Sequence, residues 1–214
     1  MKDTGLVVPR ADSGPPVPRG RLAVVLLLVA ETMFFVGMLG AYVIVRKSAE
    51  SWPPAYEAAS DKKDAEGRVI LVSVRPPRME TTLPLVNAGV LTAAMAAAFF
   101  AQRAAKRRDL TGARRALAAT AVFGAAFLAV VGLEFSTEAA RGLTLWSGQY
   151  GSMLFLIIAV HAVHVLAGLI WHFFVLWPAF SRPAGVAAER LEYLGIYWGF
   201  VAILWWVLCG ILLR

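Results

Sequence analysis

The sequence predicts an all-α fold, a polytopic membrane helical bundle with five transmembrane helices. Hydrophobic residues make up 59% of the 214-residue chain and the mean hydropathy is +0.65, well above the values of an average soluble domain. Five apolar runs reach the roughly 20 residues that cross a bilayer, and none alternates as a barrel strand does. The runs cover residues 22–45, 83–104, 116–135, 150–177 and 191–213.

The first 20 residues differ sharply in composition from the rest of the chain. They are rich in Pro, Gly and Arg, a composition typical of an extended, disordered tail. The apolar run after them exceeds the roughly 7–15 residues of a signal-peptide core, and it ends in "VIVRK" without a cleavage signal. We therefore expect a disordered cytoplasmic tail over residues 1–20 and a single five-helix transmembrane domain over residues 21–214.

Basic residues at the helix ends predict the orientation. The connection between the second and third runs contains Arg103, Lys106, Arg107, Arg108, Arg114 and Arg115. The next connection contains Arg141 alone, and short loops rich in Lys and Arg stay cytoplasmic. The N-terminus and the loops at 103–115 and 179–190 are thus predicted inside, and the C-terminus outside. The formal charge of +7 then indicates contact with anionic lipid rather than with nucleic acid.

The long loop at 46–82 is predicted to lie on the extracytoplasmic side. Two Pro-Pro pairs and mixed charges exclude a long helix, while "GRVILVSV", residues 67–74, is typical of a short strand. We expect an exposed connector, since loops are usually solvated, with contact to a partner outside the membrane as the alternative.

Polar residues within the apolar runs are the first functional candidates, because such groups are costly in a bilayer. Glu31 lies about 15 Å deep by helical rise, a depth that overlaps with those of His161 and His164 on the fourth run. The two histidines are neighbours at i and i+3. The sequence therefore predicts a Glu–His hydrogen bond between two helices, with a lipid or partner contact and a proton path as the alternatives.

The chain has few residues that could bind a haem or a metal ion. A bis-histidine haem needs ligands on both sides of the iron, whereas all three histidines share one run. No Glu-x-x-His motif is present for a dinuclear carboxylate site, and the single Cys209 has no partner cysteine. A Zn or Cu site at Glu31, His161 and His164 lacks further ligands. We expect no catalytic residue, metal site or cofactor site in this chain.

Five motifs resemble one family, in the same order along the chain. "AETMFFVGMLGAY" resembles the "SE-x-MFF-x-G" signature of subunit III of haem–copper respiratory oxidases, the cytochrome c and quinol oxidases. "LPLVNAGVLTAA" is similar to its "P-x-x-N-T-x-x-L-x-S" helix start, and "VFGAAFLAVVGLEF" to its helix with a terminal Glu-aromatic pair. "YGSMLFLIIAVHAVHVLAG" resembles "YGS-x-F-x-x-TGFHG-x-HV-x-G", and "YLGIYWGFVAILWWVL" resembles the closing "YWHFVD-x-VW" helix. The resemblance covers residues 20–213 and indicates the short five-helix form.

Two departures from the family pattern stand out. The His and Asp of the closing motif are replaced by Gly199 and Ala202, and the Thr-Gly before the first histidine by Ile158 and Ala159. The positions that match carry the candidate site residues. The resemblance implies polar interior or lipid contacts, without catalysis, for Glu31, Asn87, Glu134, His161 and His164.

The resemblance implies a non-catalytic accessory subunit of a terminal oxidase in aerobic respiration, in the inner (cytoplasmic) membrane of a bacterium. Such a subunit packs on subunit I, has subunits I and II as partners, holds phospholipid, and supports proton uptake and enzyme lifetime. Haem and copper are expected in the partner subunits. The alternatives are an accessory chain of a nitric oxide reductase and a stand-alone transporter or channel, although no internal repeat supports the latter.

Overall fold

Five long helices and one β-hairpin make up the part of the chain that the structure describes. The computed structural model describes residues 19–179 and 184–213. All five helices are long and apolar enough to cross a membrane, so the predicted helical bundle is confirmed. Most of the predicted tail, residues 1–18, lies outside the described residues. The elements are α1 (Arg19–Ser48), β1 (Tyr56–Lys63), β2 (Val69–Val74), α2 (Thr82–Lys106), α3 (Leu110–Ala140), α4 (Gly148–Ala179) and α5 (Ala184–Leu212).

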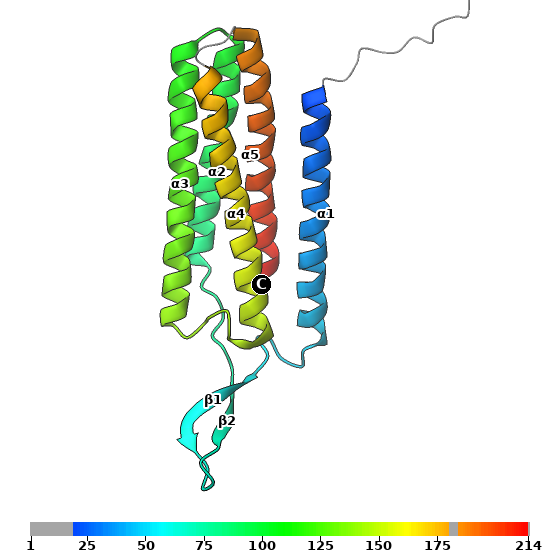
Figure 1. Ribbon diagram of the computed structural model, residues 1–214, viewed down its shortest axis with the longest axis vertical. Coiled ribbons are helices and arrows are strands. Elements are labelled where there is room, and N and C mark those ends of the chain that lie inside the picture. The colour runs from blue at the N-terminus through cyan, green and yellow to red at the C-terminus, as the bar shows by residue number, and fades with distance from the viewer. Residues whose placement is uncertain (1–18, 180–183, 214) are drawn as a thin grey trace, which may run out of the picture.

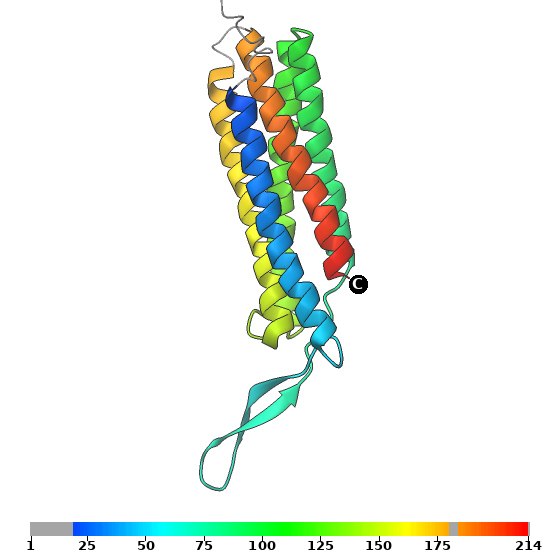
Figure 2. The same cartoon turned by 90° about the vertical axis from the view of Figure 1, so that its right-hand side faces the viewer.

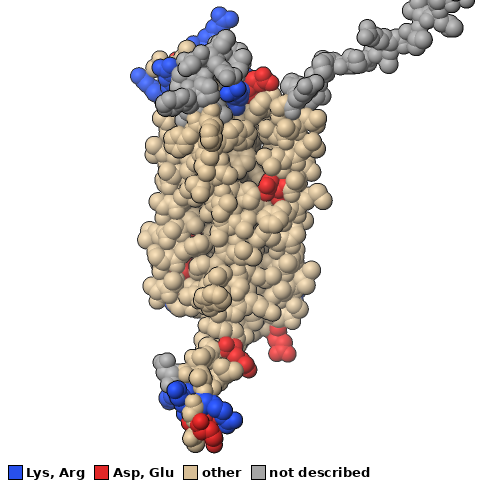
Figure 3. Space-filling view, in the orientation of Figure 1, with Lys and Arg blue, Asp and Glu red and all other residues tan. Residues whose placement is uncertain are grey.

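The helices run side by side, with α2–α5 grouped and α1 against the outside of α4 and α5 (Figure 1, Figure 2). One end of the bundle has the start of α1 and the α2–α3 connection; the other has the hairpin, the α3–α4 turn and the end of α5. Lys and Arg gather at the α2–α3 end and on the hairpin, whereas the surface between is almost uncharged (Figure 3). An uncharged band between two charged ends is what a bilayer requires.

A tight turn sets α2 antiparallel to α3. Arg108 has a positive φ of 61°, and the Asp109 side chain caps α3 by accepting a hydrogen bond from the Gly112 backbone at 2.8 Å. Small side chains then line the interface, which lets two helices approach closely in lipid. The buried alanines of α2 are Ala88, Ala94, Ala98, Ala101 and Ala105.

Aromatic side chains of α5 fill spaces left by glycines on α3 and α4. A Cβ on Gly124 would stand 2.5 Å from the Trp198 ring, and one on Gly168 would stand 2.7 Å from the Tyr197 ring. Trp198 is fully buried as a result. Tyr197 and Trp198 thus serve helix packing, whereas Trp206 is half exposed.

The loop between α1 and α2 forms an antiparallel hairpin, with Tyr56 opposite Val74 and Lys63 opposite Val69. Strand β2 is the strand predicted from "GRVILVSV". Strand β1, "YEAASDKK", was not predicted because it has no Val, Ile or Thr. The turn is held by Asp64, whose carboxylate accepts from the backbone N–H groups of Glu66 and Arg68.

Candidate functional site

Glu31 of α1 and His164 of α4 form the predicted hydrogen bond between helices. Glu31 Oε2 lies 2.6 Å from His164 Nε2, and His164 Nδ1 lies 2.7 Å from the Val160 carbonyl oxygen. Because a carbonyl only accepts, Nδ1 carries the proton of that bond. Nε2 and the carboxyl group then share one further proton, so the pair is neutral whichever atom holds it. A neutral, hydrogen-bonded pair lowers the cost of an acid within a membrane helix.

Aromatic groups from two further positions enclose this pair. The Phe35 ring meets the His164 ring edge-on at 5.2 Å between centroids, and Phe35 itself is fully buried. The Tyr197 hydroxyl of α5 donates to the His164 backbone carbonyl at 2.8 Å. The pair therefore lies where α1, α4 and α5 meet, partly shielded from lipid.

His161 points elsewhere, although it lies only three residues before His164. It is fully buried, its ring lies 5.0 Å from Trp205 and 5.7 Å from Phe127, and neither ring nitrogen has a hydrogen-bond partner among the described residues. Positions i and i+3 differ by about 60° around a helix, which directs one ring into the core and the other toward α1. Only one of the two histidines thus reaches Glu31.

Asn87 and Glu134 both lie in the bundle interior, as sequence reasoning expects. The Asn87 amide of α2 donates to the Phe127 carbonyl of α3 at 3.3 Å, which joins these two helices. Glu134 is 1% exposed, and its carboxyl oxygens have no hydrogen-bond partner among the described residues. Glu31 and Asn87 thus make two separate contacts between helices, with His164 and with the Phe127 carbonyl.

Glu138 is an interior polar residue that sequence reasoning missed. It is 3% exposed, and its Oε1 accepts from the Glu80 backbone at 3.0 Å and from Arg141 Nη1 at 2.8 Å. This carboxylate therefore fixes the segment before α2 to the end of α3. The signal in the sequence was the i, i+3 pairing of Glu138 with Arg141, which is easily read as an exposed surface pair.

A second set of polar contacts holds α1 near the hairpin end of the bundle. The Tyr42 hydroxyl donates to the Leu212 carbonyl at 3.4 Å, and Arg46 Nη1 donates to the Ile211 carbonyl at 3.3 Å. Both carbonyls belong to the last turn of α5, where helix carbonyls have no partner within the helix. Trp52 packs edge-on against Tyr42 at 5.4 Å between ring centroids.

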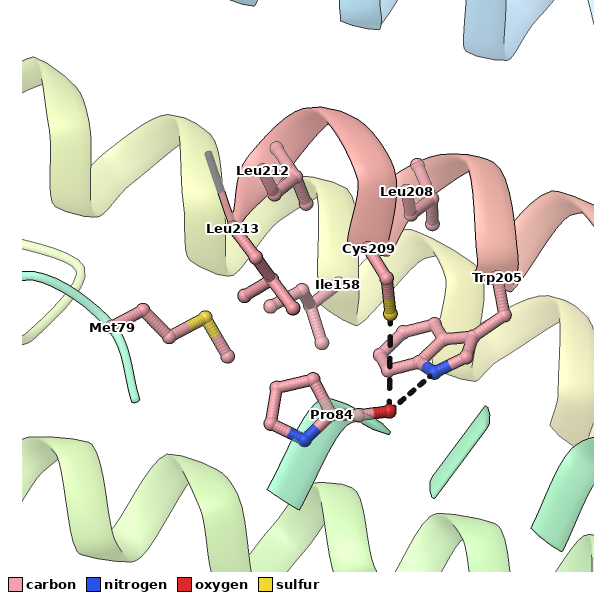
Figure 4. Close-up of a pocket in the computed structure, with 8 residues that line it drawn as sticks. All are labelled: Met79, Pro84, Ile158, Trp205, Leu208, Cys209, Leu212 and Leu213. Carbon is pink, nitrogen blue, oxygen red and sulfur yellow. Dashed lines mark hydrogen bonds between the residues drawn. The ribbon is translucent and has the colours of Figure 1, made fainter. Parts of the chain in front are cut away.

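A small pocket beside Cys209 is lined by apolar side chains. The Pro84 carbonyl accepts from Trp205 Nε1 at 3.0 Å and from the Cys209 thiol at 3.8 Å (Figure 4). Beside it lies the pocket, lined by Met79, which precedes α2, and by residues of α2, α4 and the end of the chain at α5. Over residues 19–179 and 184–213, no three His, Cys, Asp or Glu side chains are grouped to hold a metal ion. Glu31, Asn87 and His164 therefore join pairs of helices, whereas Glu134 and His161 have no hydrogen-bond partner among the described residues.

The family model described as cytochrome c oxidase subunit III matches residues 13–212, which include all five helices. The chain belongs to the cytochrome c oxidase subunit III family. This confirms the family that the five motifs indicate. The matched range contains Glu31, Asn87, Glu134, His161 and His164.

Individual relatives support the same assignment. The cytochrome c oxidase subunit 3 of Synechocystis sp. is 31% identical over 190 residues, which are 86% of this chain and 71% of the relative. The subunit 3 of Thermostichus vulcanus is 26% identical over 194 residues, covering 89% and 85%. A probable subunit 3 of Nocardia farcinica is 28% identical over 186 residues, covering 85% and 80%. Each match spans most of both chains.

Proposed function

We propose that this chain is the accessory subunit III of a haem–copper terminal oxidase in aerobic respiration. The observation that carries the proposal is the subunit III family match across all five helices. In this proposal subunits I and II hold the haem and copper, and this chain packs against subunit I. The bundle suits that role, since the Glu31–His164 bond and the bond from Asn87 to the Phe127 carbonyl join its helices and its outer faces are apolar.

The proposed subunit lies in the inner membrane of a bacterium, with the α2–α3 connection in the cytoplasm and the hairpin outside. The basic residues of that connection support this orientation. We further propose that the chain holds phospholipid and supports proton uptake and the working life of the oxidase. Broad apolar faces on α1 and α4 offer surface for lipid and for partner helices.

Two other functions remain as alternatives. A nitric oxide reductase accessory chain would use the same bundle beside a different enzyme. A transporter would need its polar groups to line one path, and here His161 is enclosed by Trp205 and Phe127 while Glu31 is bound to His164 on another side of α4. That separation favours the accessory subunit.

Affinity purification of the tagged chain from its own membranes in mild detergent, followed by mass spectrometry, tests the proposal. We expect large haem-containing oxidase subunits at close to a one-to-one ratio, with oxidase haem bands in the absorption spectrum. A tagged five-helix transporter from the same membranes is the control. Nitric oxide reductase chains in the eluate would change the assigned reaction, and a chain that purifies alone would reject the accessory role.

A further inference from the structure

We propose that a groove between α2 and α5 binds an acyl chain of an anionic phospholipid, with the lipid phosphate held by Arg103 and Arg107. The inference deepens the proposed function, because it gives the phospholipid a place and a headgroup class. It requires a membrane-embedded bundle, and its test separates it from the choice of partner enzyme.

The groove has apolar walls of a size that suits an acyl chain. It has a volume of about 410 Å³ and is lined by Met95, Ala96, Phe99 and Phe100 of α2 and by Gly195 and Gly199 of α5. Phe99 and Phe100, which are about half exposed, are part of the α2 wall of the groove. A flexible chain lying in this groove would contact two helices at once, which a lipid on a flat helix face does not.

The two glycines of α5 keep the groove open. A Cβ on Gly199 would meet no atom within 4 Å, and one on Gly195 would meet only the Gln102 side chain, at 3.9 Å. Helix packing therefore does not require a glycine at Gly199.

Arginines border the groove at the α2–α3 end. The Arg103 guanidinium carbon lies 4.3 Å from the centroid of the Phe99 ring, directly at the rim. A second hollow of about 330 Å³, between the end of α2 and the start of α3, is lined by Arg103 and Arg107, and Phe100 borders both spaces. A ligand that enters both would place an apolar chain beneath a basic cap.

The charges around this cap favour an anion. Asp109 also lines the hollow, but its carboxylate is engaged by the Gly112 backbone N–H as the cap of α3. Lys106 pairs with Glu192 at 3.3 Å, whereas Arg103 and Arg107 have no ion-pair partner among the described residues. Guanidinium groups match phosphate oxygens in a bidentate geometry.

Together the cap and the groove select the occupant. A free anion would use only the basic hollow, and a lipid without net charge would use only the groove. An anionic phospholipid would occupy both spaces. Its acyl chain would lie in the groove, and its phosphate would lie beside the arginines that border the groove. Such lipids are abundant in the leaflet that faces basic loops.

Binding of phosphatidylglycerol and phosphatidylcholine with matched acyl chains, measured by native mass spectrometry on the purified full chain or complex, tests the site. Gly199→Leu fills the groove and Arg103→Gln/Arg107→Gln removes the cap. We expect each to weaken phosphatidylglycerol binding at least tenfold. Phosphatidylcholine binding should change little in the arginine variant, whereas Gly199→Leu should weaken it as well, because an uncharged lipid also uses the groove. Gly37→Leu is the matched control, because a Cβ there also meets no atom within 4 Å; it should bind as the unmodified chain does.

Equal binding of the two lipids by the unmodified chain, or unchanged phosphatidylglycerol binding in both variants, would overturn the proposal. Circular dichroism shows whether each variant keeps its helices. Because the two variants change different parts of the site, the test still stands if one of them fails to fold. Co-purification with oxidase subunits is measured on the same samples. If oxidase subunits co-purify while lipid selectivity is absent, the lipid site fails and the accessory role stands.

Discussion

Helix α1 and the group α2–α5 are held together by different means. Within an 18-residue apolar stretch of α1, 17% of the residues are buried inside the protein. The corresponding share in α5 is 44%. Glycines that receive aromatic rings join α3, α4 and α5, whereas α1 is held by the Glu31–His164 bond and by contacts of Tyr42 with the end of α5. In lipid, apolar contact alone hardly favours a neighbouring helix over lipid. The peripheral helix α1 is therefore held by polar contacts at a few positions along its length. The helices of the group α2–α5 are held by close packing of their side chains.

The largest effect is expected where close packing is broken. In Gly124→Leu the new Cβ would lie 2.5 Å from the Trp198 ring and 2.9 Å from Leu169, both buried. Overpacking of this kind costs about 3 kcal/mol, since neither neighbour has space to move into. Thermal unfolding in nanodiscs measures the loss. Gly40→Leu on α1, where a Cβ meets no atom within 4 Å, is the control, and equal stability of the two variants would refute the difference between the regions.

A smaller effect is expected where the polar contact of α1 is removed. His164→Leu leaves the Glu31 carboxyl group without its partner, which we expect to cost about 2 kcal/mol. Glu31→Leu in addition should restore part of the loss, because two apolar side chains leave no unpaired group. A double-mutant cycle on unfolding stability measures this coupling. Additive effects of the two changes would mean that the pair does not hold α1.

His161 sharpens the comparison because it lies beside His164 in the sequence but in the core. His161→Phe removes two ring nitrogens that lack partners among the described residues and keeps a ring against Trp205 and Phe127. The expected change in unfolding stability is under about 1 kcal/mol, of either sign. The same unfolding measurement applies. A loss as large as that of His164→Leu would show that His161 has a polar partner.

The smallest effect concerns the hairpin, outside both membrane regions. The backbone N–H of Arg68 holds the pKa of Asp64 below its ordinary value of 3.8. A lowered pKa means that the carboxylate stabilises the turn above pH 3.8 and that this contribution is lost as the pH falls through the lower, folded pKa. The Gly67 amide resonance should stay constant from pH 7 to about 4 and move below that. Asp64→Asn should remove this titration; a titration that persists would assign it to another group.

The sequence predicted those features that depend on one helix at a time. The hydropathy of the sequence predicted all five helices. The similar depths of Glu31 and His164 in the membrane predicted the hydrogen bond between them. The helices extend past the apolar runs: α3 begins at Leu110 and ends at Ala140, because polar residues at a membrane surface remain helical when they are capped, as Asp109 does here.

Features that depend on how helices face one another were not predictable. The i, i+3 spacing suggested one shared role for His161 and His164, whereas the orientation of α4 directs them to different neighbours. The contact of Glu138 with the Glu80 backbone and that of Arg46 with the end of α5 join residues 58 and 165 positions apart. Nothing in the local sequence marks such partners.

The working life of the assembled oxidase tests the central claim most directly. The complex that contains Glu31→Ala is compared with the unmodified complex for haem spectrum, subunit ratio, initial turnover rate and loss of activity during turnover. We predict the same haem bands and a similar initial rate, with a faster loss of activity, since α1 is held less firmly. A haem band missing from a fully assembled variant complex would contradict the account, because Glu31 would then serve a redox centre instead of a contact between helices.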